Sequence, residues 1–474
     1  MFIRITIYIL LLMGPSFHIS AQAIQKNDSP EITLSDADKI FGLSQIWQEA
    51  KYSFVFFDQV PRLDWDKAYK EYISKVLATN TTLEYYLELS RFCALLKDGH
   101  TDVMLPAALR DKLDQPAIYV EDIQHRAIIH AVDTFLEAEI PLGSEILKVD
   151  GIEIMEYLKC EVFPLICSST EHILWDNGIR GDENKGYGLL VGRAGSPIRI
   201  TVKTTAGDIQ EINLIRDRKS RKIKWVSSYK KRELLEWKWI EDGIAYVALN
   251  SFGDMKIVEE FEKIIPKLQT AKGMIIDLRY NGGGSDNIVS AILNHLTDKP
   301  YQGFKWKTRE HRGAYKAWGK YYPDNEEVGP YYKGDAWYEE PVKEIKPTDV
   351  EKILVPLVIL TSHNTGSAAE DLLIFMDKMD HVSLVGQRTH GSTGQPIEFN
   401  LPGGGAARVC SLRCTYPDGR EFVGYGVQPD VLIEPTVESF RRDVDLVLLK
   451  GLEVISFQIK EAKKLKKSKK LGKT

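Results

Sequence analysis

The sequence predicts a multidomain α+β protein in which a helical N-terminal domain and a β-rich module precede an α/β core. Apolar residues recur with a helical period from Ile32 to Leu105, and short β runs follow from Pro106 to about Arg218. From Ile244 onward apolar strands alternate with amphipathic helices, as in βα units around a buried sheet. The length of 474 residues allows about three domains of roughly 150 residues each.

Composition and charge exclude several classes of protein. Hydrophobic residues make up 43% and charged residues 27% of the chain, which excludes a disordered or fibrous protein. The net charge of −5 conceals a split, because residues 460–474 carry eight lysines against one glutamate. The remainder is therefore acidic, which argues against a nucleic-acid partner. The lysine-rich end is expected to be a solvated tail.

Residues 1–23 have the pattern of a secretory signal peptide. Arg4 precedes an apolar run, and small residues end in Ala21-Gln22-Ala23, an A-x-A cleavage site. The run is shorter than the about 20 residues that a membrane span needs. We therefore expect export, to the periplasm or out of the cell, with no stable membrane span after cleavage. Retention as an anchor is the alternative.

The cysteines do not describe a disulfide scaffold, because they are five in number and sparse. Two pairings are conceivable, Cys160 with Cys167 and Cys410 with Cys414, but free buried thiols fit equally well. No C-x-x-C or clustered Cys/His spacing indicates a metal site, so neither metal nor cofactor is expected.

The N-terminal helical domain is expected over 24–105 and the β-rich module over 106–220. In the module, a tight turn at Asp150-Gly151 joins two short strands. The stretch 140–154 resembles the Gly-x-x-Ile-x-x-Val-Asp-Gly segment of PDZ domains, which implies capture of an extended peptide by strand addition. A plain β-hairpin is the alternative, and the segment 160–188 interrupts what would be a compact domain.

The α/β core is expected over 221–445, followed by a C-terminal helix and lysine-rich tail over 446–474. Its predicted strands are 244–249, 273–278, 353–360 and 382–385, and its predicted helices are 258–268, 286–297 and 367–379. An aromatic-rich insertion, 300–350, interrupts this rhythm. It is either a lid or binding loop over a functional site or a packed satellite subdomain.

Three segments could carry chemistry. Ser367 falls where an apolar strand runs into an apolar helix, so the helix dipole and free N–H groups could stabilise an oxyanion beside it. On propensity alone, a serine there is a helix N-cap. The glycines 282–284 end a strand and could form an oxyanion-hole loop or a tight turn. His100 lies in a polar turn after a helix.

The ordered set of motifs is more informative than any one of them. In chain order it reads D-G-H-T (98–101), D-L-R-Y-N-G-G-G (277–284), T-x-x-x-x-G-S-A-A-E (361–370), V-G-x-x-T-x-G (385–391) and G-x-G-V-x-P-D (424–430). This set resembles the serine peptidase family of the C-terminal processing (tail-specific) peptidases and the tricorn core protease. The resemblance implies a ClpP/crotonase-like βα superhelix as core and Ser367 as nucleophile. It also implies an oxyanion hole from Gly282 or Gly283 with the amide of Ala368.

The resemblance is closer to the tricorn-like branch. Processing peptidases of the Ser-Lys type carry their base as a lysine in a T-x-G-K turn, and here that turn ends in Ser392. The tricorn branch uses a histidine in the early motif, which corresponds to His100, so the resemblance implies a Ser-His pair. His390 is a further candidate base.

The acid that would orient His100 is left open. The tricorn branch has a serine directly before the histidine, where this chain has Gly99, and a glutamate near the last motif. Glu421 is the first candidate for that acid, and Asp418 and Asp98 are its competitors.

The sequence therefore predicts an exported serine-type peptidase that cleaves peptides or partly unfolded proteins through an acyl-enzyme, without metal or cofactor. A non-catalytic peptide-binding protein on an inactive peptidase scaffold is the rival. An acyl-CoA-type enzyme on a related βα superhelix is a weaker one, because no phosphate loop is present. The sequence does not indicate the oligomeric state.

Overall fold

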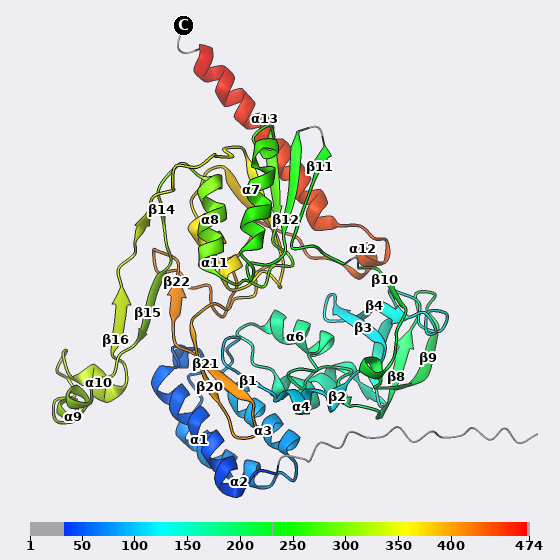
Figure 1. The fold of residues 1–474 in the computed structure, drawn as a ribbon, viewed down its shortest axis with the longest axis vertical. Helices are drawn as coiled ribbons and strands as arrows, with labels where there is room; N and C mark the ends of the chain where they lie inside the picture. The colour runs from blue at the N-terminus through cyan, green and yellow to red at the C-terminus, as the bar shows by residue number, and fades with distance from the viewer. Residues whose placement is uncertain (1–32, 230, 242, 472–474) are drawn as a thin grey trace, which may run out of the picture.

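The computed structural model describes residues 33–229, 231–241 and 243–471, and the predicted signal peptide lies outside them. The chain forms three regions, which are the N-terminal helices, a β-rich region and an α/β core, and they meet at the centre of the molecule (Figure 1). No helix among the described residues is both long and apolar enough to cross a membrane. All five cysteines are free thiols, so neither conceivable pairing is formed.

The N-terminal region contains mainly helices. Its helices are α1 (Asp36–Ser53), α2 (Trp65–Leu77) and α3 (Thr82–Ala94), with a short α4 (Ala107–Arg110) further on. Side chains of Ser35, Asp64 and Thr81 accept hydrogen bonds from the N3 backbone and begin the three long helices. The helices share one hydrophobic cluster with the α/β core, so they are not an isolated unit.

A small sheet joins this region to the distant end of the chain. Strand β1 (Asp102–Met104) pairs antiparallel with β21 (Ala406–Cys410), which also pairs with β20 (Pro396–Asn400). This pairing brings the loop that ends at His100 into the core.

The β-rich region contains a seven-stranded sheet with the order β10-β4-β5-β8-β9, in which β3 pairs with β4 and β6 with β5. The predicted hairpin is present between β5 and β6, where Asp150 and Gly151 both have positive φ. The identity of this region as a PDZ-like domain stays a prediction. Its elements are β2 (Leu113–Asp114), β3 (Ile118–Asp122), β4 (Ala127–Asp133), β5 (Glu145–Val149), β6 (Ile152–Glu153), α5 (Ile154–Tyr157), α6 (Glu171–Arg180), β7 (Gly192–Arg193), β8 (Pro197–Lys203), β9 (Ile209–Ile215) and β10 (Trp225–Ser227).

The core is a six-stranded sheet with the order β11-β12-β13-β18-β19-β23, parallel except for β11. Strands β12, β13 and β18 are buried throughout because α7, α8 and α11 cover one face and α13 the other (Figure 1). The bounds are β11 (Leu235–Glu241), β12 (Ile244–Leu249), α7 (Lys256–Leu268), β13 (Gly273–Asp277), α8 (Asp286–Leu296), β18 (Leu357–Thr361), α11 (Ala368–Phe375), β19 (Val382–Gly386), β23 (Val431–Leu432), α12 (Val437–Arg441) and α13 (Leu446–Leu471).

The 300–350 insertion forms an arm beside the core. It comprises β14 (Tyr301–Gln302), β15 (Lys305–Arg309), α9 (Gly313–Tyr321), α10 (Gly329–Lys333), β16 (Trp337–Glu340) and β17 (Glu344–Ile345). Strand β15 is held between β16 and β22 (Arg413–Thr415). The tip, α9 with α10, lies at the lower left of Figure 1, apart from the core sheet, and several of its aromatic side chains are exposed.

Candidate active site

Ser367 occupies a strained turn between β18 and α11. Its backbone has φ 52° and ψ −127°, a conformation that residues with a side chain rarely adopt. The surroundings hold it there, because its N–H donates to the Ser392 carbonyl (3.2 Å) and its own carbonyl accepts from the Glu370 N–H (2.7 Å). A sharp strand-to-helix turn of this kind presents a serine hydroxyl at the end of a sheet.

The glycine loop after β13 packs directly against this turn. A Cβ on Gly283 would lie 2.7 Å from the Ser367 Cβ and 2.9 Å from the Ala368 nitrogen, so only glycine fits. The Gly283 N–H already donates to Asn281 Oδ1 at 2.9 Å. Among the described residues, the N–H groups of Gly282 and Ala368 have no acceptor. Of the predicted donors, these two are left available for an oxyanion.

His100 meets the Ser367 turn through Ser392. The His100 Nδ1 lies 2.6 Å from Ser392 Oγ, and the Ser392 carbonyl accepts the Ser367 N–H. A Cβ on Gly99 would lie only 2.8 Å from Ser392 Oγ. The hydroxyl beside His100 thus comes from residue 392, and the side-chain space before the histidine is left empty for it.

The structure does not place a hydrogen bond between His100 and Ser367, nor does it place Glu421 at His100. Glu421 is exposed and accepts from Arg413 Nη2 at 2.8 Å. Its competitor Asp418 pairs with Arg420.

Asp98 lies closer to His100 but does not contact its ring. It is 1% exposed, and its Oδ2 accepts the His100 backbone N–H at 3.1 Å and the Thr101 hydroxyl at 2.7 Å. Burial raises the Asp98 pKa to about 6. The role visible for Asp98 is to fix the loop that carries His100.

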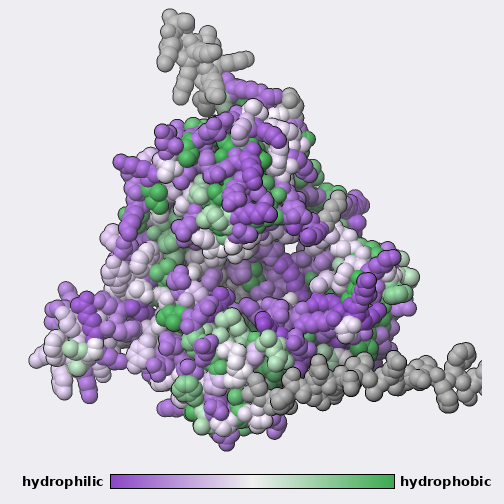
Figure 2. Space-filling model, viewed as in Figure 1, coloured by the Kyte–Doolittle hydropathy of each residue, from purple (hydrophilic) through white to green (hydrophobic). Residues whose placement is uncertain are grey.

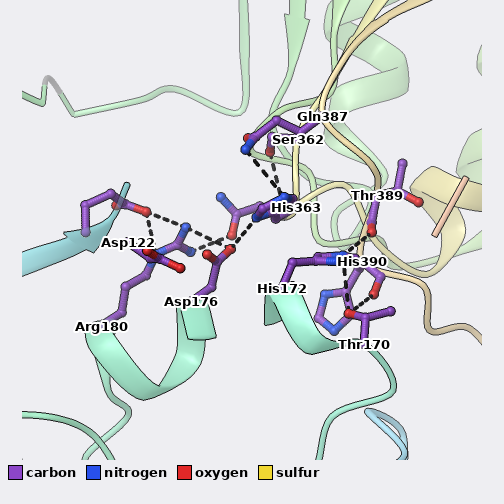
Figure 3. Close-up of polar contacts among 12 residues, drawn as sticks. Asp122, Thr170, His172, Asp176, Arg180, Ser362, His363, Gln387, Thr389 and His390 are labelled. Atoms are coloured by element: carbon purple, nitrogen blue, oxygen red, sulfur yellow. Dashed lines mark hydrogen bonds and ion pairs between the residues drawn. The ribbon is translucent and has the colours of Figure 1, made fainter. Parts of the chain in front are cut away.

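The two candidate bases are both uncharged at neutral pH. Burial lowers the pKa of His100 to about 4 and that of His390 to about 3. The His390 ring packs over Gly366, where a Cβ would lie 3.3 Å from its Nδ1. Its backbone carbonyl accepts from the Thr170 hydroxyl at 3.0 Å (Figure 3). Both imidazoles are therefore neutral and lie close to the nucleophile turn.

Glu370 connects the parts of the site, and the sequence analysis assigned it no role. It is fully buried, and its Oε2 accepts from the N–H groups of Ser367 (3.1 Å) and Ser392 (3.2 Å). Its Oε1 accepts from the Gly391 N–H (2.7 Å) and the Thr389 hydroxyl. Burial raises its pKa to about 7. The signal that could have identified it is the capping-box spacing of serine and glutamate at a helix start.

The arrangement has the parts for acyl transfer to a serine. These are a strained serine at a helix N-terminus, two unpaired N–H groups beside it, and a neutral imidazole held by a hydroxyl. Among residues 33–229, 231–241 and 243–471, no group of three or more His, Cys, Asp or Glu side chains is arranged to hold a metal ion.

Comparisons with known proteins agree with this geometry. Residues 243–433 match the model of Peptidase family S41. The chain is 23% identical over 282 residues to the tricorn protease of Thermoplasma volcanium, an alignment that covers 58% of this chain and 24% of the relative. The chain thus spans about a quarter of the length of that relative.

Solved structures show the same fold. Mature CPAF superposes with a TM-score of 0.66 and 16% identity, covering 86% of this chain and 94% of that chain. Mature CPAF complexed with lactacystin gives 0.65 and 16%, covering 91% and 98%. The predicted resemblance to the C-terminal processing and tricorn peptidases is confirmed.

Proposed function

We propose that this protein is a serine-type peptidase with Ser367 as its nucleophile and His100 as its base. The match of residues 243–433 to peptidase family S41 supports this activity. The observation that carries the proposal is the strained Ser367 turn, packed against Gly283 and flanked by two N–H groups without acceptors. We further propose that its substrate is an extended or partly unfolded segment of a peptide or protein.

In this mechanism His100 Nε2 takes the proton of Ser367 Oγ while the oxygen attacks the scissile carbonyl. For this role His100 carries its proton on Nδ1 and donates it to Ser392 Oγ, 2.6 Å away, which leaves a lone pair on Nε2. The N–H groups of Gly282 and Ala368 receive the oxyanion, and the proton passes from His100 to the leaving amine. Water then hydrolyses the acyl-enzyme by the same steps.

Labelling with a fluorophosphonate tests the nucleophile and the base together. We expect modification at Ser367 alone, found by peptide mapping, and its loss in His100→Ala. His390→Ala serves as the matched histidine control and should keep most of the labelling. Labelling that survives in His100→Ala but is lost in His390→Ala would transfer the role of base to His390.

The low pKa of His100 predicts an unusual pH profile. The base works only when neutral, and burial lowers its pKa from 6.5 to about 4. As pH falls, kcat/KM is therefore expected to persist below pH 6 and to decline only near pH 4 to 5. Measurement of kcat/KM across this pH range tests the prediction. The stability of the fold at acidic pH is measured in parallel. A half-point at 6.5 would contradict a buried base.

The rival is a peptide-binding protein without turnover, and one observation favours it: His100 is bonded to Ser392 and not to Ser367. Catalytic hydrogen bonds are often completed only when substrate binds, so the peptidase is the better proposal. The rival predicts a folded protein that binds peptides but resists the fluorophosphonate.

We further propose that the protein is exported and loses residues 1–23. The support is the sequence pattern of these residues, with its A-x-A site. Intact-mass measurement of the protein purified from its natural host should give a chain that begins at Ile24. A mass that includes Met1 would contradict export by this route.

A further inference from the structure

A cavity of about 600 Å³ lies between the β-rich region and the core. On the core side, its wall comes from residues that follow the carboxyl ends of β13, β18, β19 and β23, the edge at which α/β sheets bind ligands. On the other side, the end of β3 and helix α6 form the wall. Figure 2 shows the hollow between these regions to be mainly hydrophilic.

The cavity lies close to the proposed nucleophile. Asn364 lines it and stands three residues before Ser367, so their Cα atoms are at most about 11 Å apart. Tyr280 lines it and stands two residues before Gly282. An extended peptide advances about 3.3 Å per residue, so a substrate at Ser367 reaches the cavity within about four residues of the scissile bond.

Two of the three arginines that line the cavity are neutralised by acidic partners. Arg180 is paired with Glu121 and Asp176 and also donates to Asn364 Oδ1 at 2.6 Å (Figure 3). The guanidinium of Arg279 is bound by Asp277 and Asp445. The third, Arg388, is exposed. The guanidinium groups of Arg180 and Arg279 are therefore neutralised by their own partners.

Asp122 is a buried acid of the cavity wall that no arginine or lysine in the described part of the chain pairs with. Its side chain is 5% exposed, and its Oδ1 has no hydrogen-bond partner among the described residues. The other oxygen faces His125 Nδ1 at 3.4 Å. Its neighbour Asp176 is satisfied by His363 Nδ1 at 3.1 Å as well as by Arg180. Burial raises the Asp122 pKa to about 6, and the charge of Asp176 and a hydrogen bond with it act in the same direction.

A buried carboxylate with an unsatisfied oxygen is costly unless a donor or a cation reaches it. Tyr229 and Tyr280 also line the cavity, and the guanidinium of Arg232 already lies over the Tyr280 ring, 3.4 Å from its centroid. The unpaired Asp122 oxygen needs a hydrogen-bond donor, and a positively charged donor is favoured because it also neutralises the carboxylate.

We propose that this cavity is a substrate subsite that takes a cationic nitrogen of the peptide, within about four residues of the scissile bond, and that Asp122 determines this preference. The inference rests on the proposed peptidase function and names its substrate class: peptides with a lysine, an arginine or a free amino terminus at that distance. Apolar or acidic groups there leave Asp122 unsatisfied.

The test is a panel of N-acetylated fluorogenic peptides, each with one lysine moved stepwise along either side of the scissile bond. Each has a twin with norleucine, which keeps the length and removes the charge. At one position, we expect kcat/KM for lysine to exceed that for norleucine by about 10- to 100-fold. Peptides with a free amino terminus and no lysine distinguish an α-ammonium from a side chain as the preferred group.

The Asp122→Asn variant should reduce the lysine preference, measured as the ratio of kcat/KM for each lysine peptide to that for its norleucine twin, to within a factor of about two. Glu211→Gln, which alters an exposed acid of the same region far from the cavity wall, should leave the preference intact. The wild-type panel does not depend on the folding of any variant. Equal rates for lysine, free-amine and norleucine peptides, or a preference that survives Asp122→Asn, would overturn the subsite. Failure to cleave any peptide would instead count against the proposed function.

Discussion

Alanine at Ser367, at His100 or at both positions is expected to lower kcat by one and the same factor, about 10⁶. The reason is that the two side chains act as a unit: without the imidazole the hydroxyl keeps its proton, and without the hydroxyl the imidazole has no proton to take. Once either is gone, loss of the other costs nothing more. The residual rate would come from the Gly282 and Ala368 N–H groups and from binding.

Steady-state kinetics of the two single variants and the double variant measures this, with KM or direct peptide binding as the control for folding. KM should change little, because neither side chain is needed to bind an extended peptide. Two losses that multiply in the double variant would show that Ser367 and His100 act independently. A His100→Ala variant near wild-type activity would remove His100 from the mechanism.

The core fold could be predicted because its signal is local. Strands such as Ile244–Leu249 are continuous apolar runs that end at turns, and these runs become the fully buried parallel strands β12, β13 and β18. The pairing of β1 with β21 could not be predicted in this way. It joins residues about 300 positions apart, and nothing within the short segment Asp102–Met104 specifies its partner.

In the candidate site, too, the features set by local sequence could be predicted and those set by distant contacts could not. Ser367 and the glycine loop lie at ends of strands, where the motif itself specifies the turn. The environment of His100 depends on how a distant loop folds back, so sequence reasoning placed Glu421 there and overlooked Ser392. Glu421 stands near the right motif but is drawn to Arg413 at the surface. Spacing along the chain does not reveal such competition between charged partners.

The role of Glu370 leads to the second large expected effect. Glu370→Gln should lower kcat about 100-fold, because the nucleophile turn and the loop of Ser392 lose their common acceptor and shift relative to each other. The amide nitrogen of glutamine cannot accept, so buried donors are left unpaired. We expect a loss of at least about 1–3 kcal/mol in the free energy of unfolding.

The stability of the wild type should carry a matching pH signature. The Glu370 pKa rises from 4.5 in the unfolded chain to about 7 in the fold, so between these values the native state binds a proton that the unfolded chain releases. Glu370 therefore makes the fold less stable as pH rises from 4.5 to 7, and the glutamine variant should lack this contribution. Denaturant unfolding across that range, with the exposed Glu398→Gln as control, measures the difference. Glu370→Gln could instead keep the wild-type kcat and the wild-type dependence of the free energy of unfolding on pH. Glu370 would then not be the group that joins the Ser367 turn to the loop of Ser392.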